Sequence, residues 1–256
     1  MQENLTGQPV SIGTYYPDAG DAQAPSDVAV VITTVLRAAL LDAVNSVYGQ
    51  SYGGRIQLLI GVDKAFGPID GLNALLARRP PHVSAIVLTL PFSTSIRHGG
   101  VHRAQDGGSI RSMLTFMANS QYVAYLDDDN QWEPEHLAGL LEAVRGKVWA
   151  HSMRLLIDQA SGKEMAVDRW DSVGVGRGRF AETGGFVDPN CLLIDKVAAG
   201  RALGRWSEGP GMMSDRKFFA AIREAAHGQV NAPTVRYFVR AQDTMFAKFL
   251  RDGVEF

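Results

Sequence analysis

Three adjacent carboxylates, Asp127, Asp128 and Asp129, directly follow an apolar run at residues 122–126. Neighbouring negative charges repel one another, so they are costly unless solvent or a cation balances them. Carboxylate oxygens suit Mg²⁺ or Mn²⁺, which commonly bind one or two carboxylates together with substrate phosphates. The alternative interpretation is an acidic turn before the next helix. An EF-hand is excluded because Trp132 occupies the position of its required glycine.

A further carboxylate, Asp215, begins a segment at residues 215–226 whose apolar residues have helical spacing. Ser214 suits an N-cap, and an acid in the first turn is favourable with the helix dipole, so a structural role is one interpretation. The other is a general base, because a positioned carboxylate can contribute roughly 10²–10⁴ in rate.

Alternating strands and helices must position these residues. Continuous apolar, β-branched runs predict buried parallel strands at residues 28–32, 57–62, 83–88 and 122–126. Helical spacing of apolar residues predicts helices at 36–47, 69–78 and 137–144. This alternation predicts an α/β fold with a mostly parallel central sheet flanked by helices. Ligands of such sheets bind beyond the carboxyl ends of the strands, where Thr33, Asp63 and the acidic triplet lie.

The second half of the chain is less regular. We expect a strand at 148–157, a long loop at 159–183 and an apolar stretch at 186–194. Asp188 and Asn190 interrupt that stretch, and buried polar groups there need partners. Trp206, near a Gly-Pro-Gly turn, is expected in the core rather than stacked on a sugar.

These patterns predict a single domain over residues 27–240. Its first half, 27–145, is expected to bind a nucleotide in a Rossmann-like manner, and its second half, 146–240, to shape the acceptor site. Residues 1–26 are expected to form an N-terminal extension, and 241–256 a C-terminal tail. The tail carries an apolar stripe that we expect to dock on the core or on a second subunit, which would make a homodimer: Met245, Phe246, Phe249 and Leu250.

Composition narrows the functional classes. The 256 residues carry a formal net charge of -2, without the basic excess typical of a general nucleic-acid binder. The N-terminus lacks the pattern of a secretory signal, and no run approaches the ~20 apolar residues of a membrane span. One cysteine, Cys191, allows no intrachain disulfide. We therefore expect a cytoplasmic protein without a transmembrane segment.

Several segments together resemble glycosyltransferase family 2. The run Val28–Thr34, the segment Ser46–Tyr52 and the strand ending in Asp63 resemble the opening of that family. Tyr122–Asn130 and the residues after it resemble the family's DxD segment. Asp215-Arg216-Lys217-Phe218-Phe219 is similar to a helix start in members of the spore-coat polysaccharide type. The resemblance covers residues 28–145 and continues more weakly to about residue 227.

The resemblance implies a GT-A fold and an inverting, metal-dependent glycosyltransferase of polysaccharide biosynthesis. Its donor would be a nucleotide-diphosphate sugar, with UDP expected on family grounds, and its acceptor a hydroxyl of a saccharide or other molecule. The implied residue roles are base contacts from Thr33 and Asp63, a ribose contact from Asp127 or Asp128, Mn²⁺ or Mg²⁺ ligation by Asp129, and proton removal by Asp215. Arg111 lies where the family has an arginine near the nucleotide, although a plain surface arginine is an equal interpretation.

Two other classes stay open. A nucleotidyltransferase that makes nucleotide-sugars has a similar sheet, but usually has a Gly-rich, Arg/Lys-containing phosphate loop after its first strand. The segment Thr33-Thr34-Val35-Leu36-Arg37 lacks such a loop. A non-catalytic nucleotide-binding relic of the fold is the second alternative, and it would not require the acidic triplet or Asp215.

Overall fold

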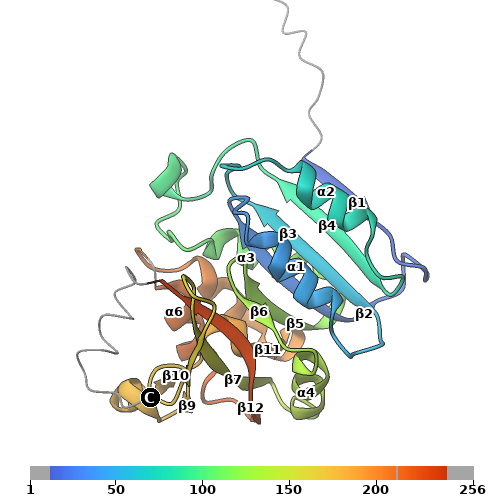
Figure 1. Cartoon of the computed structure of the whole chain (residues 1–256). Helices are drawn as coiled ribbons and strands as arrows, with labels where there is room; N and C mark the ends of the chain where they lie inside the picture. The colour runs from blue at the N-terminus through green and yellow to red at the C-terminus, as the bar shows by residue number, and fades with distance from the viewer. Residues whose placement is uncertain (1–11, 212, 241–256) are drawn as a thin grey trace, which may run out of the picture.

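The computed structural model describes residues 12–211 and 213–240, so the predicted C-terminal tail and its apolar stripe lie outside the described residues. A ten-stranded sheet in the order β1-β4-β3-β2-β5-β11-β7-β12-β6, with β8 paired to β7, forms the centre of the molecule (Figure 1). A separate two-stranded sheet joins β9 and β10.

The strands are β1 (Gly13–Tyr16), β2 (Ser26–Thr34), β3 (Ile56–Val62), β4 (Val83–Thr89), β5 (Ser120–Asp127), β6 (Gln131–Trp132), β7 (Trp149–Asp158), β8 (Glu164–Val167), β9 (Gly174–Val175), β10 (Gly185–Phe186), β11 (Leu192–Asp195) and β12 (His227–Val239). The α-helices are α1 (Leu40–Tyr48), α2 (Asp70–Ala77), α3 (Gly108–Met117), α4 (His136–Ala143), α5 (Lys196–Ala199) and α6 (Ser214–Ile222). The 3₁₀ turns are η1 (Ile96–His98), η2 (Gly178–Thr183), η3 (Pro189–Cys191) and η4 (Gly200–Ser207).

The four neighbouring strands β4, β3, β2 and β5 are parallel. Their side chains are almost all buried because helices cover both faces, which explains the continuous apolar runs in the sequence. The chain moves from β2 to β4 in one direction and returns to β5 on the other side of β2. Right-handed crossovers therefore place α1 and α2 on one face and α3 on the opposite face. The predicted α/β class with a mostly parallel central sheet is confirmed.

The second half of the chain extends this sheet with mixed strand directions. β11 is antiparallel to both β5 and β7, whereas the long β12 runs parallel to β7. One continuous apolar core crosses both halves. Its fully buried members include Trp206, which stacks on Phe218, as expected of a core tryptophan, and Cys191. None of the described helices is long and apolar enough to cross a membrane.

Several predicted boundaries were wrong. The first helix begins at Leu40 rather than residue 36, because Leu36 has φ 62° and breaks the helical path. The last helix ends at Ile222, before the predicted residue 226, since β12 begins at His227. The expected loop at 159–183 contains β8, β9 and η2. Within the predicted N-terminal extension, residues 13–16 form an edge strand antiparallel to β4.

Candidate active site

A cleft of about 620 Å³ opens at the carboxyl ends of the parallel strands. This volume is within the range of small-molecule sites, and the position is the usual ligand site of open α/β sheets. The structure brings all seven predicted site residues to its walls: Thr33, Asp63, Arg111, Asp127, Asp128, Asp129 and Asp215. The sheet order explains this, because β3, β2 and β5 are adjacent and end at the same edge.

Asp127 ends β5 and is held from two sides. The buried Arg111 on α3 donates from Nη2 to Asp127 Oδ1 at 2.7 Å. Asn190 donates from Nδ2 to Asp127 Oδ2 at 2.8 Å, and its Oδ1 accepts from the Asp127 backbone N–H. The Arg111 guanidinium also lies 4.9 Å from the Trp206 ring centroid. Arg111 is therefore a buried partner of the acidic triplet and not a surface arginine.

The other two carboxylates of the triplet share an arginine. Asp128 accepts from the Thr34 hydroxyl at 2.6 Å and from Arg37 Nη1 at 3.0 Å. Arg37 Nη1 also lies 3.0 Å from Asp129 Oδ2, and Arg240 at the end of β12 donates to the same oxygen at 2.5 Å. Two guanidinium groups thus gather where three acidic side chains meet.

The electrostatics around Asp129 favour a further positive charge. Burial, followed by repulsion from Asp127 and Asp128, raises the pKa of Asp129 to about 6, although Arg37 and Arg240 act in the opposite direction. Within residues 12–211 and 213–240, no three His, Cys, Asp or Glu side chains are arranged as a complete metal site. Mg²⁺ is commonly held by one or two carboxylates plus substrate phosphates, and Asp129 fits that limited donor set.

Asp63 follows β3 and is buried in the cleft wall. Its Oδ2 accepts from the Ser93 hydroxyl at 2.6 Å, and its Oδ1 accepts from the backbone N–H and hydroxyl of Thr94, both at 2.7 Å. Asp63 therefore fixes the turn at residues 93–95, and a lone pair on Oδ2 remains available for a ligand. Thr33 is the next-to-last residue of β2, in register with Asp127.

The turn after β2 explains how Arg37 reaches the triplet. Leu36 has a left-handed backbone, which is unfavourable for a side chain of this size. The Thr34 hydroxyl accepts from the Leu36 N–H at 2.8 Å and so stabilises the turn. A Cβ on Gly67 would lie 2.2 Å from the Leu36 carbonyl oxygen, so only glycine allows the chain to pass this closely.

Asp215 occupies the first turn of α6 and lines the same cleft. Ser214 is not the N-cap that its sequence position suggests. Met213 precedes the helix without a side-chain cap, and Asp106 accepts from the Ser214 N–H at 3.0 Å instead. Burial raises the pKa of Asp215 to about 7, with Asp188 and Asp106 adding to the shift and the Arg216 N–H and guanidinium opposing it.

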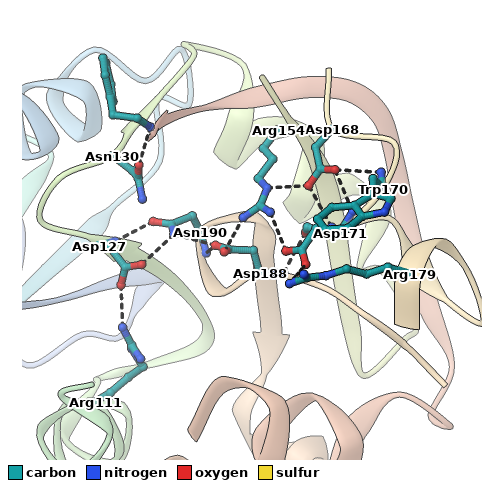
Figure 2. A network of polar contacts seen from close by, with 12 residues as sticks. Arg111, Asp127, Asn130, Arg154, Asp168, Trp170, Asp171, Arg179, Asp188 and Asn190 are labelled. Atoms are coloured by element: carbon teal, nitrogen blue, oxygen red, sulfur yellow. Dashed lines mark hydrogen bonds and ion pairs between the residues drawn. The ribbon is translucent and has the colours of Figure 1, made fainter. Parts of the chain in front are cut away.

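A buried polar network extends from Asp127 to Arg154 (Figure 2). Asn190 donates to Asp188 at 2.6 Å as well as to Asp127, and Arg154 Nη1 donates to Asp188 at 2.7 Å. Arg154 also binds two further carboxylates, Asp168 at 2.8 Å and Asp171 at 2.7 Å. The partners expected for Asp188 and Asn190 are therefore present, and they link Asp127 on β5 to Arg154 on β7.

Sequence reasoning missed three residues of the site. Arg37 falls within the helix predicted at 36–47, and its sequence context did not distinguish it from an exposed helical arginine. Arg240 lies at the end of β12, which the sequence did not predict. Asp106 joins the starts of α3 and α6 by accepting from the Gly108 and Ser214 N–H groups.

Comparison with known structures identifies the class of fold. The sequence matches no protein-family model and no curated protein. The chain has a GT-A-type glycosyltransferase fold. It is similar to S. aureus TarS 1-349, with a TM-score of 0.60 and 10% identity over 83% of this chain and 60% of that chain.

Two further structures of the same protein agree. S. aureus TarS 1-349 in complex with UDP-GlcNAc matches with a TM-score of 0.59 and 9% identity, over 86% of this chain and 61% of that chain. S. aureus TarS matches with a TM-score of 0.58 and 10% identity over 83% of this chain and 37% of that chain. The chain thus spans about three fifths or less of the TarS chains it matches.

Proposed function

We propose that this protein is an inverting glycosyltransferase that moves a sugar from a nucleotide-diphosphate donor to a hydroxyl group of a saccharide or other acceptor. The observation that carries the proposal is the position of Asp215, a carboxyl with a pKa raised to about 7, on the wall of the cleft that also contains the acidic triplet. A general base with a pKa near neutrality works best at neutral pH.

In the proposed reaction Asp215 accepts the proton of the acceptor hydroxyl while that oxygen attacks the anomeric carbon from the opposite side. The bond between the anomeric carbon and the diphosphate oxygen breaks, and its electron pair leaves with the nucleoside diphosphate. Arg37 and Arg240 lie beside the triplet and are suited to the negative charge that develops on the diphosphate. Mn²⁺ or Mg²⁺, held by Asp129, would neutralise part of the same charge.

The other residues of the cleft are proposed to hold the donor. Thr33 and Asp63 face the base, and Asp127 or Asp128 faces the ribose, with Arg111 fixing Asp127 in place. UDP is the proposed nucleotide because S. aureus TarS, which has a similar fold, was solved in complex with UDP and with UDP-GlcNAc. UDP-GlcNAc is therefore the first donor to test.

Thermal-shift measurements with UDP, GDP, dTDP and CDP, each with Mn²⁺ or with EDTA, test the donor site. A ligand at ~100 times its dissociation constant adds about 2.7 kcal/mol, which raises the midpoint by several degrees. We expect a rise with UDP that disappears in EDTA and in Asp129→Asn, but persists in Asp42→Asn, whose carboxyl is exposed on α1. No rise with any nucleotide contradicts the donor site, and a rise insensitive to EDTA contradicts the metal.

Release of UDP from UDP-GlcNAc tests the base. We expect Asp215→Asn to lower turnover by roughly 10²–10⁴ while the UDP-induced thermal shift is retained. Unchanged turnover in this variant removes Asp215 from the mechanism. Release of pyrophosphate from a nucleoside triphosphate and a sugar phosphate would instead support the nucleotidyltransferase alternative.

A further inference from the structure

A second pocket, of about 540 Å³, lies beside the start of α6 and against β10 and η2. Three arginines and three phenylalanines characterise its lining: Arg179, Arg216, Arg223, Phe180, Phe186 and Phe219. None of the described residues that line it is acidic. The pocket therefore combines an aromatic floor with guanidinium groups, and nothing in the proposed donor site uses it.

Arg216 is the central cation of this pocket. Its guanidinium lies 3.6 Å from the Phe180 ring centroid and 4.5 Å from that of Phe186, so stacking on two rings fixes its orientation. Among the described residues, the Arg216 side chain has no hydrogen-bond or ion-pair partner. Burial, together with repulsion from Arg179, lowers the pKa of Arg216, although the carboxylates of Asp215, Asp171 and Asp188 act in the opposite direction. A half-buried guanidinium that is held by aromatic rings, and has no direct hydrogen-bonded anion, is suited to bind one.

The two other arginines are anchored on either side. Arg179 stacks on Phe180, 4.3 Å from its ring centroid, and its Nη2 lies 2.6 Å from Asp171 Oδ1. Arg223 donates to the Thr183 carbonyl and pairs with the exposed Glu224. A planar guanidinium group can donate two parallel hydrogen bonds to two oxygens of one phosphate or carboxylate. The three arginines are therefore suited to bind one oxyanion.

The position of this pocket relates it to the proposed reaction. Asp215 lines the donor cleft, and the next residue, Arg216, lines the second pocket, so both cavities border the first turn of α6. We propose that the second pocket binds a phosphate or carboxylate group of the acceptor, an inference that rests on the proposed glycosyltransferase function. The acceptor is then an anionic saccharide, and its charged group is anchored one residue from the base.

Calorimetric titration with glucose 6-phosphate, glucuronate and uncharged glucose tests this inference on the full chain, with and without saturating UDP and Mn²⁺. We expect at least one of the two anions to bind, glucose not to bind, and added salt to weaken the binding. Whichever anion binds more tightly identifies phosphate or carboxylate as the preferred group.

Arg216→Gln is expected to weaken anion binding by roughly 10- to 100-fold. The matched control is Arg201→Gln, an exposed arginine of η4, which should leave it unchanged.

An unchanged UDP thermal shift shows that Arg216→Gln is folded, and Arg216→Lys, which keeps the charge but loses the planar fork, should bind with intermediate affinity. Glucose binding equal to that of both anions, anion binding unaffected by Arg216→Gln, or competition between UDP and the anion overturns the inference. UDP binding without anion binding refutes the acceptor pocket and leaves the glycosyltransferase proposal intact. Anion binding without any nucleotide binding supports the anion pocket and removes the proposed donor reaction.

Discussion

At the scale of single residues, Asp215 shows how burial determines chemistry. Its carboxyl lies in a first helical turn, where exposed acids are usually ionised and stabilised by the helix dipole. Here loss of solvent, with Asp188 and Asp106 nearby, raises its pKa to about 7. The same shift that makes Asp215 a suitable base also makes its charged form unfavourable for folding.

Asp215→Asn is expected to stabilise the protein at pH 8. Because the folded-state pKa is raised above the ordinary value of 3.8, stability is highest below that value and is lost as the pH rises through about 7. Replacing the carboxyl by an uncharged amide removes this loss, a gain on the order of 1–3 kcal/mol. Urea unfolding at pH 8 and pH 4 measures it, and a gain of equal size at both pH values contradicts the assignment.

At the scale of elements, the contact between β3 and α3 depends on Gly61. A Cβ at this position would lie 2.2 Å from Ile110 Cγ2 and 2.9 Å from Leu114 Cδ1. The helix that packs so closely carries Arg111, whose guanidinium binds Asp127. The absence of a side chain in β3 thus determines the position of an arginine at the cleft.

Gly61→Ala is expected to destabilise the protein by about 1–3 kcal/mol, because the added methyl group overpacks this contact. It should also weaken UDP binding, since α3 must shift and carry Arg111 with it. Gly53→Ala is the control, because a Cβ there meets nothing within 4 Å. Equal urea midpoints for the two variants would falsify the packing argument.

The elements also show what the sequence could and could not reveal. The strands β2 to β5 were predictable because helices cover both faces and require continuous apolar runs. β12 was not, because Pro233 and the register shifts around it interrupt the pattern of a half-exposed strand. The left-handed turn at Leu36 was also hidden, since nothing in a leucine side chain favours that backbone. Arg37 and Arg240 were missed for these two reasons.

At the scale of the whole molecule, one buried polar network joins the two halves of the chain. Arg154 on β7 is fully buried and binds Asp168, Asp171 and Asp188. Burial would raise the pKa of Asp168, but Arg154 and backbone N–H donors hold it below its usual range. Through Asn190 the network reaches Asp127, so the acidic site of the first half depends on the second half (Figure 2).

Arg154→Met is expected to cost about 3–5 kcal/mol at pH 8, because buried carboxylates lose their counter-charge. Without the arginine their folded-state pKa values rise, so the loss should shrink as the pH falls and the carboxyls take up protons. Chemical denaturation at pH 8 and pH 5 measures both effects. Arg145→Met, at an exposed i,i+3 pair with Glu142, should change stability by less than about 0.5 kcal/mol.

The single cysteine lies in the middle of this connection. Cys191 directly follows Asn190, is fully buried, and has a thiol whose pKa is raised by that burial. A thiol-specific reagent can reach the sulfur only when the packing around it opens, and that opening also removes the burial that suppresses the reactive thiolate. The rate at which Cys191 is labelled therefore reports the fraction of molecules in which the junction between the two halves is open, when closing is faster than the labelling reaction.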